Sequence, residues 1–221
     1  MLPRVILHNA SSVDGRMDWC AVDLGLYYEL AARWNVDAIL GGSNTMLAAP
    51  GQQPDRDDET FVPERVPDDP RPLLAVVDSQ GRIHNWNFWR KQPYWRDVLV
   101  LCSRATPRVY LDELQNKRVN YFIAGDDRVD LRAALEELNT RYGVQSVRVD
   151  SGGVLNGVLL RAGLVGEVSI LFTPSLVGGM TPRSIFTAPD LASADGVVPL
   201  KLTHVEKLND DVVWIRYQIA K

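Results

Sequence analysis

The chain has 221 residues, of which 46% are hydrophobic and 24% are charged, and its formal net charge at pH 7 is −4. This composition is typical of a globular protein, and we predict a single domain over residues 1–221. Lys and Arg are scattered without a basic block, so the sequence does not show the charge pattern of a nucleic-acid-binding protein and we expect no nucleic-acid partner.

Cysteine and histidine are too sparse to indicate a metal site. The chain contains only Cys20, Cys102, His8, His84 and His204, with no Cys-x-x-Cys pair and no histidine cluster. No segment has the roughly 20 apolar residues that a membrane span needs, and the N-terminus lacks the apolar run of a signal peptide. We therefore expect a cytoplasmic protein that makes no membrane contact.

Taken in chain order, short apolar runs alternate with helical patterns. The runs that predict strands are residues 4–10, 37–42, 73–78, 98–103, 121–125, 146–150 and 167–172. Several are apolar at nearly every position, as strands covered on both faces are. Because strands and helices alternate, the sequence predicts an α/β fold with a mainly parallel sheet.

Three other segments have distinct patterns. The clearest helix lies within residues 130–143, with Asp130 as its N-cap and Gly143 at its end. The proline-rich, acidic stretch 50–72 predicts a long loop without regular structure. The C-terminal residues 200–221 alternate with period two and predict an antiparallel hairpin added to the sheet.

Aromatic residues are concentrated in the segment His84–Trp95, HNWNFWRKQPYW. Aromatic side chains this dense favour a packing flap or a dimer contact over a surface that stacks bases.

Paired glycines follow two of the predicted strands, in AILGGSNT (38–45) and VDSGGVLNG (149–157). In an open α/β sheet, a glycine just after a strand allows backbone N–H groups to approach a phosphate. Neither stretch is a GxGxxG motif or a P-loop, so a tight strand-to-helix turn is the alternative interpretation.

Four motifs together resemble the reductases of riboflavin biosynthesis, which have a dihydrofolate-reductase-like fold. They are ASSVDGRM (10–17), DAILGGSNTML (37–47), VVDSQGRI (76–83) and the stretch from VDSGG to LVGG (149–179). The resemblance extends over nearly the whole chain, and the four motifs occur in the family's order and spacing. It implies a three-layer α/β fold whose mainly parallel sheet carries the C-terminal hairpin.

The resemblance implies an NADPH-dependent reductase that converts the ribosylamino side chain of a pyrimidine ribose 5-phosphate to the ribitylamino form. Hydride would reach the ribose C1′, through the ring-opened imine. Ala10 would lie beside the nicotinamide, and Ser12 and Asp14 would shape the substrate end. His8 is the one histidine on this strand, with a core position as its alternative interpretation. Asp14 and Gly15 are equally interpretable as a plain turn.

The resemblance also implies a set of cofactor-binding residues. Gly42 and Thr45 would contact the cofactor, and Ser103 and Arg104 would hold its 2′-phosphate. Along the adenosine half would lie Asp78, Ser79, Gln80 and Arg82. At the pyrophosphate would lie Ser151, Gly152, Gly153 and Val154. We expect Gly153→Val to weaken cofactor binding and to leave the fold intact.

The sequence departs from the family pattern after Thr45. Ala48 and Ala49 stand where the family has paired aspartates, and Asp150 replaces the family's glutamate. Three hypotheses therefore stay open: the riboflavin-pathway reductase, a reductase of the same fold with another heterocycle such as a pterin, and a nucleotide-binding protein without turnover. The deaminated and undeaminated pyrimidines are not distinguished either.

The C-terminal hairpin also predicts an oligomer. Its apolar and aromatic residues are Val205, Val212, Trp214, Ile215, Tyr217 and Ile219. They exceed what one sheet face needs, and an edge strand must be covered or paired. The related reductases are dimers, so we expect a homodimer with a two-fold contact across this face.

Overall fold

The computed structural model describes residues 1–20, 22–55, 60–64, 66–180 and 183–220. The chain divides into two compact units. The first comprises Met1–Pro3 and Val36–Val147, and the second comprises Arg4–Asn35 and Arg148–Lys221. The organisation as one domain stays a prediction.

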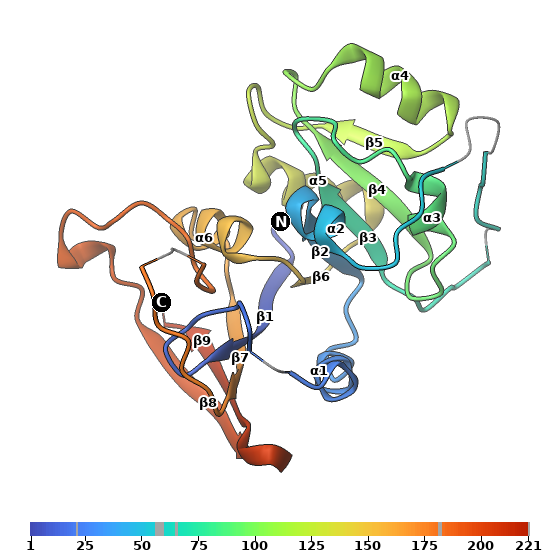
Figure 1. The fold of residues 1–221 in the computed structure, drawn as a ribbon. Coiled ribbons are helices and arrows are strands. Elements are labelled where there is room, and N and C mark those ends of the chain that lie inside the picture. The colour runs from blue at the N-terminus through green and yellow to red at the C-terminus, as the bar shows by residue number, and fades with distance from the viewer. Residues whose placement is uncertain (21, 56–59, 65, 181–182, 221) are drawn as a thin grey trace. The chain divides into compact units, whose positions relative to one another are not determined.

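The first unit is built on parallel strands in the order β5-β4-β3-β2. These are β2 (Ala38–Gly42), β3 (Leu73–Val77), β4 (Asp97–Cys102) and β5 (Asn120–Ile123), accompanied by α2 (Ser43–Ala48), α3 (Trp86–Arg90), α4 (Arg108–Asn116) and α5 (Leu131–Tyr142). Figure 1 shows these strands side by side, with α4 along β5. β2, β3 and β4 are buried at nearly every position, which explains their continuous apolar sequence.

The boundaries of α5 confirm the predicted helix. The Asp130 side chain accepts hydrogen bonds from the backbone N–H groups of Arg132 and Ala133 at 2.9 and 3.1 Å. Gly143 ends the helix in the left-handed conformation, with φ of 69°. Such ends satisfy backbone groups that a helix leaves unpaired.

The aromatic segment packs into the first unit, which confirms the packing interpretation. Trp86 is fully buried, and its indole N–H donates to the Tyr110 hydroxyl at 3.2 Å. The backbone N–H groups of Asn87 and Phe88 donate to the Asp55 carboxylate in the preceding loop. The described residues of the stretch 50–72 contain no helix or strand, as predicted.

The second unit combines parallel and antiparallel pairs. β1 (Arg4–Ser12) pairs in parallel with β7 (Glu167–Thr173), β7 pairs with β9 (Val213–Ile219), and β9 pairs antiparallel with β8 (Leu200–Lys207). The unit also contains α1 (Leu24–Ala31) and α6 (Gly153–Arg161), whereas β6 (Ser146–Val149) passes from the first unit into the second. The predicted hairpin is confirmed, and its turn lies at Asn209–Asp211.

Buried charge is compensated on β7. Glu167 is 1% exposed, and its carboxylate forms ion pairs with Arg4 and, at 2.7 Å, with Arg216. The Arg216 guanidinium also lies over the Trp34 ring, 4.8 Å from its centroid. A buried carboxylate without such partners would strongly destabilise the fold.

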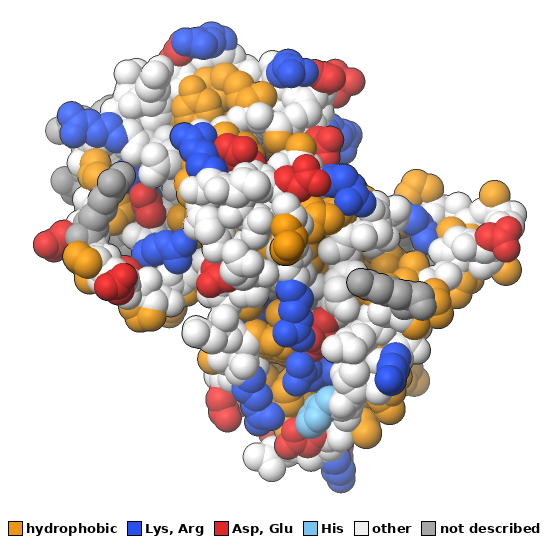
Figure 2. All heavy atoms as spheres, turned by 180° about the vertical axis from the view of Figure 1, so that it is seen from behind, with side chains coloured by type: hydrophobic (Ala, Val, Ile, Leu, Met, Phe, Trp, Pro, Cys, Tyr) orange, Lys and Arg blue, Asp and Glu red, His pale blue; other side chains and the backbone are white. Residues whose placement is uncertain are grey.

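The surface carries charges of both signs. In the view of Figure 2, basic and acidic side chains are interspersed with hydrophobic ones. Among the described residues, no helix is both long and apolar enough to cross a membrane. In the same part of the chain, no group of three or more His, Cys, Asp or Glu residues could hold a metal ion.

Candidate functional site

Asp14 connects the turn after β1 to the loop that contains Val177 and Gly178, both in the second unit. Its carboxylate accepts hydrogen bonds from the Ser12 hydroxyl at 2.6 Å and from the backbone N–H groups of Val177 and Gly178 at 3.0 and 2.7 Å. These bonds, first that of Ser12, lower the pKa of Asp14 to about 2. The sequence interpretation of a turn is therefore supported, and the turn also holds the distant loop that contains Gly178.

His8 lies inside the second unit. Its side chain is fully buried, Nδ1 lies 2.9 Å from the Ser169 hydroxyl, and Nε2 lies 3.2 Å from the Tyr27 carbonyl oxygen. Burial is the main cause that lowers the pKa of His8 to about 4, against the raising effect of the Tyr27 carbonyl. His8 is thus neutral at pH 7 with both ring nitrogens engaged, which supports the core interpretation over a substrate contact.

Two buried asparagines, Asn9 and Asn156, connect β1 to α6. Asn9 donates from Nδ2 to the Ser151 carbonyl at 2.9 Å. Asn156 donates from Nδ2 to Asn9 Oδ1 at 2.8 Å and lies 3.0 Å from the Ile185 carbonyl. Sequence reasoning missed this pair, although an asparagine inside an apolar strand and another inside a helix are both unfavoured choices.

The two glycines at the start of α6 differ in their surroundings. A Cβ on Gly152 would meet no atom within 4 Å, whereas one on Gly153 would overlap the Ser184 carbonyl and lie 2.8 Å from the Thr187 hydroxyl. The expectation that Gly153→Val leaves the fold intact is therefore wrong, because the chain's own backbone occupies that space. Gly152 is the glycine with open space beside it, and Val154 is 55% exposed in the first turn.

Asp150 precedes these glycines and is half-buried. Burial raises its pKa, while Arg148 and a 3.5 Å hydrogen bond from the Tyr27 hydroxyl oppose that rise. The carboxyl group therefore holds its proton at higher pH than an ordinary aspartate does. Sequence reasoning noted this residue as the first position of the motif that resembles the family's pyrophosphate loop, and as a departure from the glutamate of that motif.

In the first unit, Asp78 organises the loop after β3. Its fully buried carboxylate accepts hydrogen bonds through Oδ2 from the backbone N–H groups of Arg82 and Ile83 and from the Tyr110 hydroxyl, at 2.8 to 3.0 Å. Burial and the charge of Asp78 raise the pKa of Tyr110, which keeps that hydroxyl protonated as a donor. Gly81 has φ of 65° and lies so close to the Tyr110 ring that a Cβ would come within 2.6 Å.

Arg82 extends from this loop to the start of α2. Its guanidinium lies 2.6 Å from both the Ser43 hydroxyl and the Asn44 side-chain oxygen. The exposed Arg82 side chain thus extends from a backbone that Asp78 fixes. A hydroxyl and an amide group lie beside its guanidinium. Gly42 and Thr45 belong to the same strand end and helix, and Gln80 is exposed in the same loop.

The predicted pair Ser103 and Arg104 does not form an open anion site. The Ser103 hydroxyl is fully buried and lies near Thr106 and the Asp127 carbonyl. Arg104 forms an ion pair with Asp126, and both side chains are about three-quarters exposed. A phosphate at Arg104 would meet the Asp126 carboxylate, so the geometry argues against this pair as its binding site.

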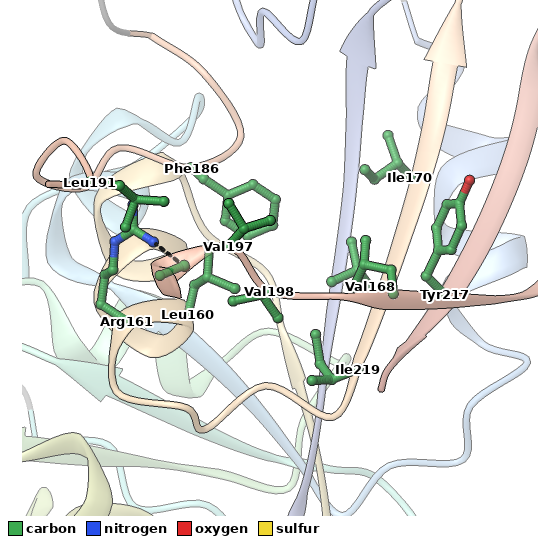
Figure 3. A pocket seen from close by; sticks show the side chains of 12 residues that line it. Leu160, Arg161, Val168, Ile170, Phe186, Leu191, Val197, Val198, Tyr217 and Ile219 are labelled. Carbon is green, nitrogen blue, oxygen red and sulfur yellow. Dashed lines mark hydrogen bonds between the residues drawn. The ribbon is translucent and has the colours of Figure 1, made fainter. Parts of the chain in front are cut away.

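An apolar cavity of about 320 Å³ lies elsewhere in the second unit. Figure 3 shows Val168, Ile170 and Tyr217 on the strands facing Phe186 and Val197 of the loop 186–198. Arg161 is held against this loop by hydrogen bonds to the Pro189 and Gly196 carbonyls. No residue predicted for substrate or cofactor lines this cavity, and its apolar walls do not suit a phosphate.

The structure brings the predicted residues together in two groups, one in each unit. The first-unit group follows β2, β3 and β4 and contains Gly42, Thr45, Asp78, Ser79, Gln80, Arg82, Ser103 and Arg104. The second-unit group lies at the C-terminal ends of β1 and β6 and at the start of α6, and contains Ala10, Ser12, Asp14, Ser151, Gly152, Gly153 and Val154. His8, also on β1, is fully buried. Ser79 stabilises its own unit, since its hydroxyl accepts from the Val129 N–H at 3.0 Å.

The sequence is similar to a defined family and to named enzymes. The model of the RibD C-terminal domain family matches residues 3–214. A protein named 2,5-diamino-6-ribosylamino-4(3H)-pyrimidinone 5′-phosphate reductase from Methanothermobacter thermautotrophicus is 30% identical over 96% of this chain and 97% of its own. A protein of the same name from Archaeoglobus fulgidus is 31% identical over 94% and 93%.

Among solved structures, Acinetobacter baumannii RibD superposes with a TM-score of 0.72 at 21% identity. The match covers 99% of this chain and 58% of that one, so this chain spans little more than half of the larger protein. This similarity confirms the predicted fold class.

The free energy of unfolding should fall at acidic pH, because His8 then takes up a proton. A histidine whose pKa is lower in the folded chain than its ordinary 6.5 stabilises the fold fully above pH 6.5, and this contribution is lost as the pH falls toward about 4. The loss amounts to roughly 3 kcal/mol. Urea unfolding should therefore give a difference in the free energy of unfolding between wild type and His8→Gln that is smaller at pH 4.5 than at pH 7. Parallel pH profiles would contradict this assignment.

Proposed function

The chain belongs to the RibD C-terminal domain family, and on this premise we propose that it is a pyrimidine reductase of riboflavin biosynthesis. The observation that carries the proposal is the match, nearly end to end, to two reductases that bear the same name. That name supports 2,5-diamino-6-ribosylamino-4(3H)-pyrimidinone 5′-phosphate, the undeaminated pyrimidine, as the substrate. A cytoplasmic location accompanies the proposal.

The reaction adds one hydride and one proton to the substrate. When the ribose ring opens, the C1′–O bond breaks, the ring oxygen takes up the proton that the amino nitrogen gives up and becomes a hydroxyl, and C1′ forms an imine with that nitrogen. Hydride then adds to C1′ and a proton adds to the nitrogen, which leaves a ribitylamino side chain. Asp150 is the proton donor we propose, because burial raises its pKa, whereas His8 is neutral and enclosed.

A reductase of this family implies a nicotinamide cofactor as the hydride source. The residues at the start of α6 are compatible with its pyrophosphate, since Gly152 has open space on its Cβ side and the helix N-terminus favours negative charge. We assign this role to Ser151, Gly152 and Val154 with the first turn of the helix. Ala10, at the end of β1, stays our proposal for the nicotinamide contact.

NADPH is the cofactor we propose, with Arg82 as the group that binds its 2′-phosphate. The guanidinium has five N–H donors, and Ser43 and Asn44 add a hydroxyl and an amide beside it. The backbone under Arg82 is fixed by Asp78. Arg104 is the weaker candidate because Asp126 already neutralises it.

The C-terminal hairpin supports a homodimer. By register, Leu200, Leu202 and Val205 of β8 lie on the same face as Ile219, Tyr217 and Ile215 of β9. The three β8 side chains are 46 to 62% exposed, and β8 is an edge strand. A second copy that presents the same face would bury both apolar surfaces.

Two residues expected in this contact do not belong to it. Trp214 is fully buried and donates from its indole N–H to the Ser169 hydroxyl at 2.8 Å, and Val212 is 7% exposed. Trp214 alternates with Ile215, so its side chain lies on the opposite face of the sheet.

The purified protein should oxidise NADPH with the undeaminated pyrimidine ribose phosphate, yielding the ribitylamino product. Parallel assays with the deaminated pyrimidine and with a pterin panel separate the remaining hypotheses. Faster turnover of the deaminated compound would indicate that deamination comes before reduction. Turnover of a pterin alone would indicate another reductase activity. NADPH binding without turnover of any compound would indicate a non-catalytic nucleotide-binding protein.

Arg82→Ala should weaken NADPH binding at least tenfold and change NADH binding less than twofold, because a charge-assisted contact contributes about 1.5–3 kcal/mol. Arg104→Ala is the matched control and should leave both affinities nearly unchanged. Fluorescence titration of each variant with each cofactor measures the effect. A larger loss in Arg104→Ala would restore Arg104 as the phosphate ligand, and equal losses for both cofactors in Arg82→Ala would indicate general destabilisation.

Sedimentation at micromolar concentration should give about twice the chain mass of 24.7 kDa. Leu202→Glu should shift the protein to a monomer, since it places a carboxylate in the apolar contact. Val109→Glu is the control, because Val109 is 78% exposed on α4 and lies outside the hairpin. A wild-type monomer, or a dimer that survives Leu202→Glu, would contradict the proposed interface.

A further inference from the structure

Arg148 places a buried positive charge inside the second unit. It lies on β6 and is 7% exposed, and a guanidinium keeps its charge in proteins. Its Nη1 donates to the Ala31 carbonyl at 3.1 Å, at the C-terminal end of α1, where a cation is favoured. Its Nε is buried and has no hydrogen-bond partner among the described residues. In the first unit, by contrast, the buried guanidinium of Arg90 is paired with Asp97 at 3.0 Å.

Asp150 faces the same helix as Arg148. The two residues are two positions apart at the end of β6, so their side chains lie on one face of the strand. Arg148 contacts Ala31, and Asp150 Oδ1 lies 3.5 Å from the Tyr27 hydroxyl. Tyr27 and Ala31 are four residues apart and share one side of α1. The guanidinium and the carboxyl group are therefore packed against the same side of this helix.

His8 and Tyr27 complete this cluster, and both are neutral at pH 7. The Tyr27 hydroxyl donates to the His8 carbonyl at 2.7 Å, and burial is the main cause that raises the pKa of Tyr27 well above its ordinary value. Burial likewise is the main cause that lowers the pKa of His8 to about 4. Of the three neighbours of Arg148 in the cluster, Asp150 is thus the one that can offset its charge by becoming a carboxylate.

Proton donation by Asp150 leaves a negative charge at this position. When Asp150 gives its proton to the substrate nitrogen, its O–H bond breaks and the electron pair stays on the carboxylate oxygen. In a half-buried position such a charge is unfavourable unless an opposite charge lies near it. Arg148 supplies that charge without moving, because its bond to the Ala31 carbonyl already holds the guanidinium in place.

We infer that Arg148 is a positioning residue for proton donation, and that its fixed positive charge stabilises the carboxylate that Asp150 becomes. This inference rests on the proposed function, in which Asp150 is the proton donor. Arg148 needs no contact with the substrate, because it acts through Asp150.

Arg148→Met tests the inference, since methionine removes the charge and an apolar side chain suits a buried position. Burial raises the pKa of Asp150 and Arg148 opposes that rise, so the variant should raise this pKa further, by about one unit or more. NMR titration of the ¹³C resonance of the Asp150 carboxyl group measures the pKa, and Asp150→Asn assigns the signal. This measurement does not depend on activity.

Arg33→Met is the matched control. Arg33 follows α1 in the same unit, but its side chain is 49% exposed and lies 3.7 Å from the Glu206 carboxylate. The variant removes the same charge from an exposed position, where water and salt screen it. It should leave the pKa of Asp150 and the rate of reduction nearly unchanged.

Single-turnover assays of NADPH oxidation measure the effect on the reaction. A higher pKa keeps Asp150 protonated to higher pH, so in Arg148→Met the alkaline limb of the rate profile should move to higher pH by the same amount. The rate at pH 7 should fall about fivefold or more, because a weaker acid gives up its proton more slowly.

An unchanged pKa of Asp150 in Arg148→Met would overturn the inference. A raised pKa with an unchanged rate and pH profile would also overturn it, as would an equal loss of rate in Arg33→Met. If Arg148→Met does not fold, Arg148→Gln replaces it, because its amide keeps a donor for the Ala31 carbonyl without the charge. The same shift is expected there, and an unchanged pKa would overturn the inference.

The outcomes separate this inference from the proposed function. Full activity in Asp150→Asn would overturn Asp150 as the proton donor, and with it the role of Arg148 in the reaction. A wild-type protein that turns over no pyrimidine would overturn the proposed function, whereas the NMR titration would still show whether the charge of Arg148 acts on the Asp150 carboxyl group.

Discussion

The close contact between α6 and the backbone of residues 184–188 is the constraint on which the second unit's site depends. Gly153 and Gly157 are four residues apart and so lie on one face of the helix. A Cβ at either position would overlap a carbonyl oxygen of this segment, that of Ser184 or of Thr187. Glycine inside a helix is about 1 kcal/mol less favourable than alanine, and here the close approach explains its use. Gly152, where a Cβ would meet no atom within 4 Å, lies outside this close contact.

Local sequence signals were sufficient for most of the fold. The Asp130 cap, the left-handed Gly143 and the alternation of β8 and β9 each depend on neighbours within a few residues or on one partner strand. Continuous apolar runs likewise predicted the buried parallel strands. These features could be read from the sequence because each has a short-range physical cause.

The roles of individual site residues depended on partners far along the chain, and the sequence could not supply them. Gly153 is closed by Ser184, and Ser103 is enclosed near Asp127. Neither partner belongs to a recognisable motif. Resemblance to a family predicted roles for residues at these strand ends, but only the structure distinguishes a residue with open space beside it from one that supports the turn.

Aspartates after the strands illustrate the same distinction. Asp14 and Asp78 both use their carboxylates to bind backbone N–H groups of a loop, those of residues 177 and 178 and of residues 82 and 83. The bonds to Asp14 lower its pKa, and the bonds to Asp78 come from the chain's own loop and from Tyr110. Their contribution is therefore to fix loop shape, and in the first unit that shape presents Arg82.

Burial disfavours the charged form of both His8 and Asp150, and this has opposite effects on their pKa values. It favours the neutral form of each, so the pKa of His8 falls and that of Asp150 rises. A neutral imidazole lacks the acidic second proton of the imidazolium, and both ring nitrogens of His8 are engaged, whereas the raised pKa of Asp150 lets its carboxyl group keep a proton to higher pH. Asp150 is also half-buried and can be reached from solvent, while His8 is fully enclosed. These differences are the reason that we propose Asp150, rather than His8, as the source of the proton at the substrate nitrogen.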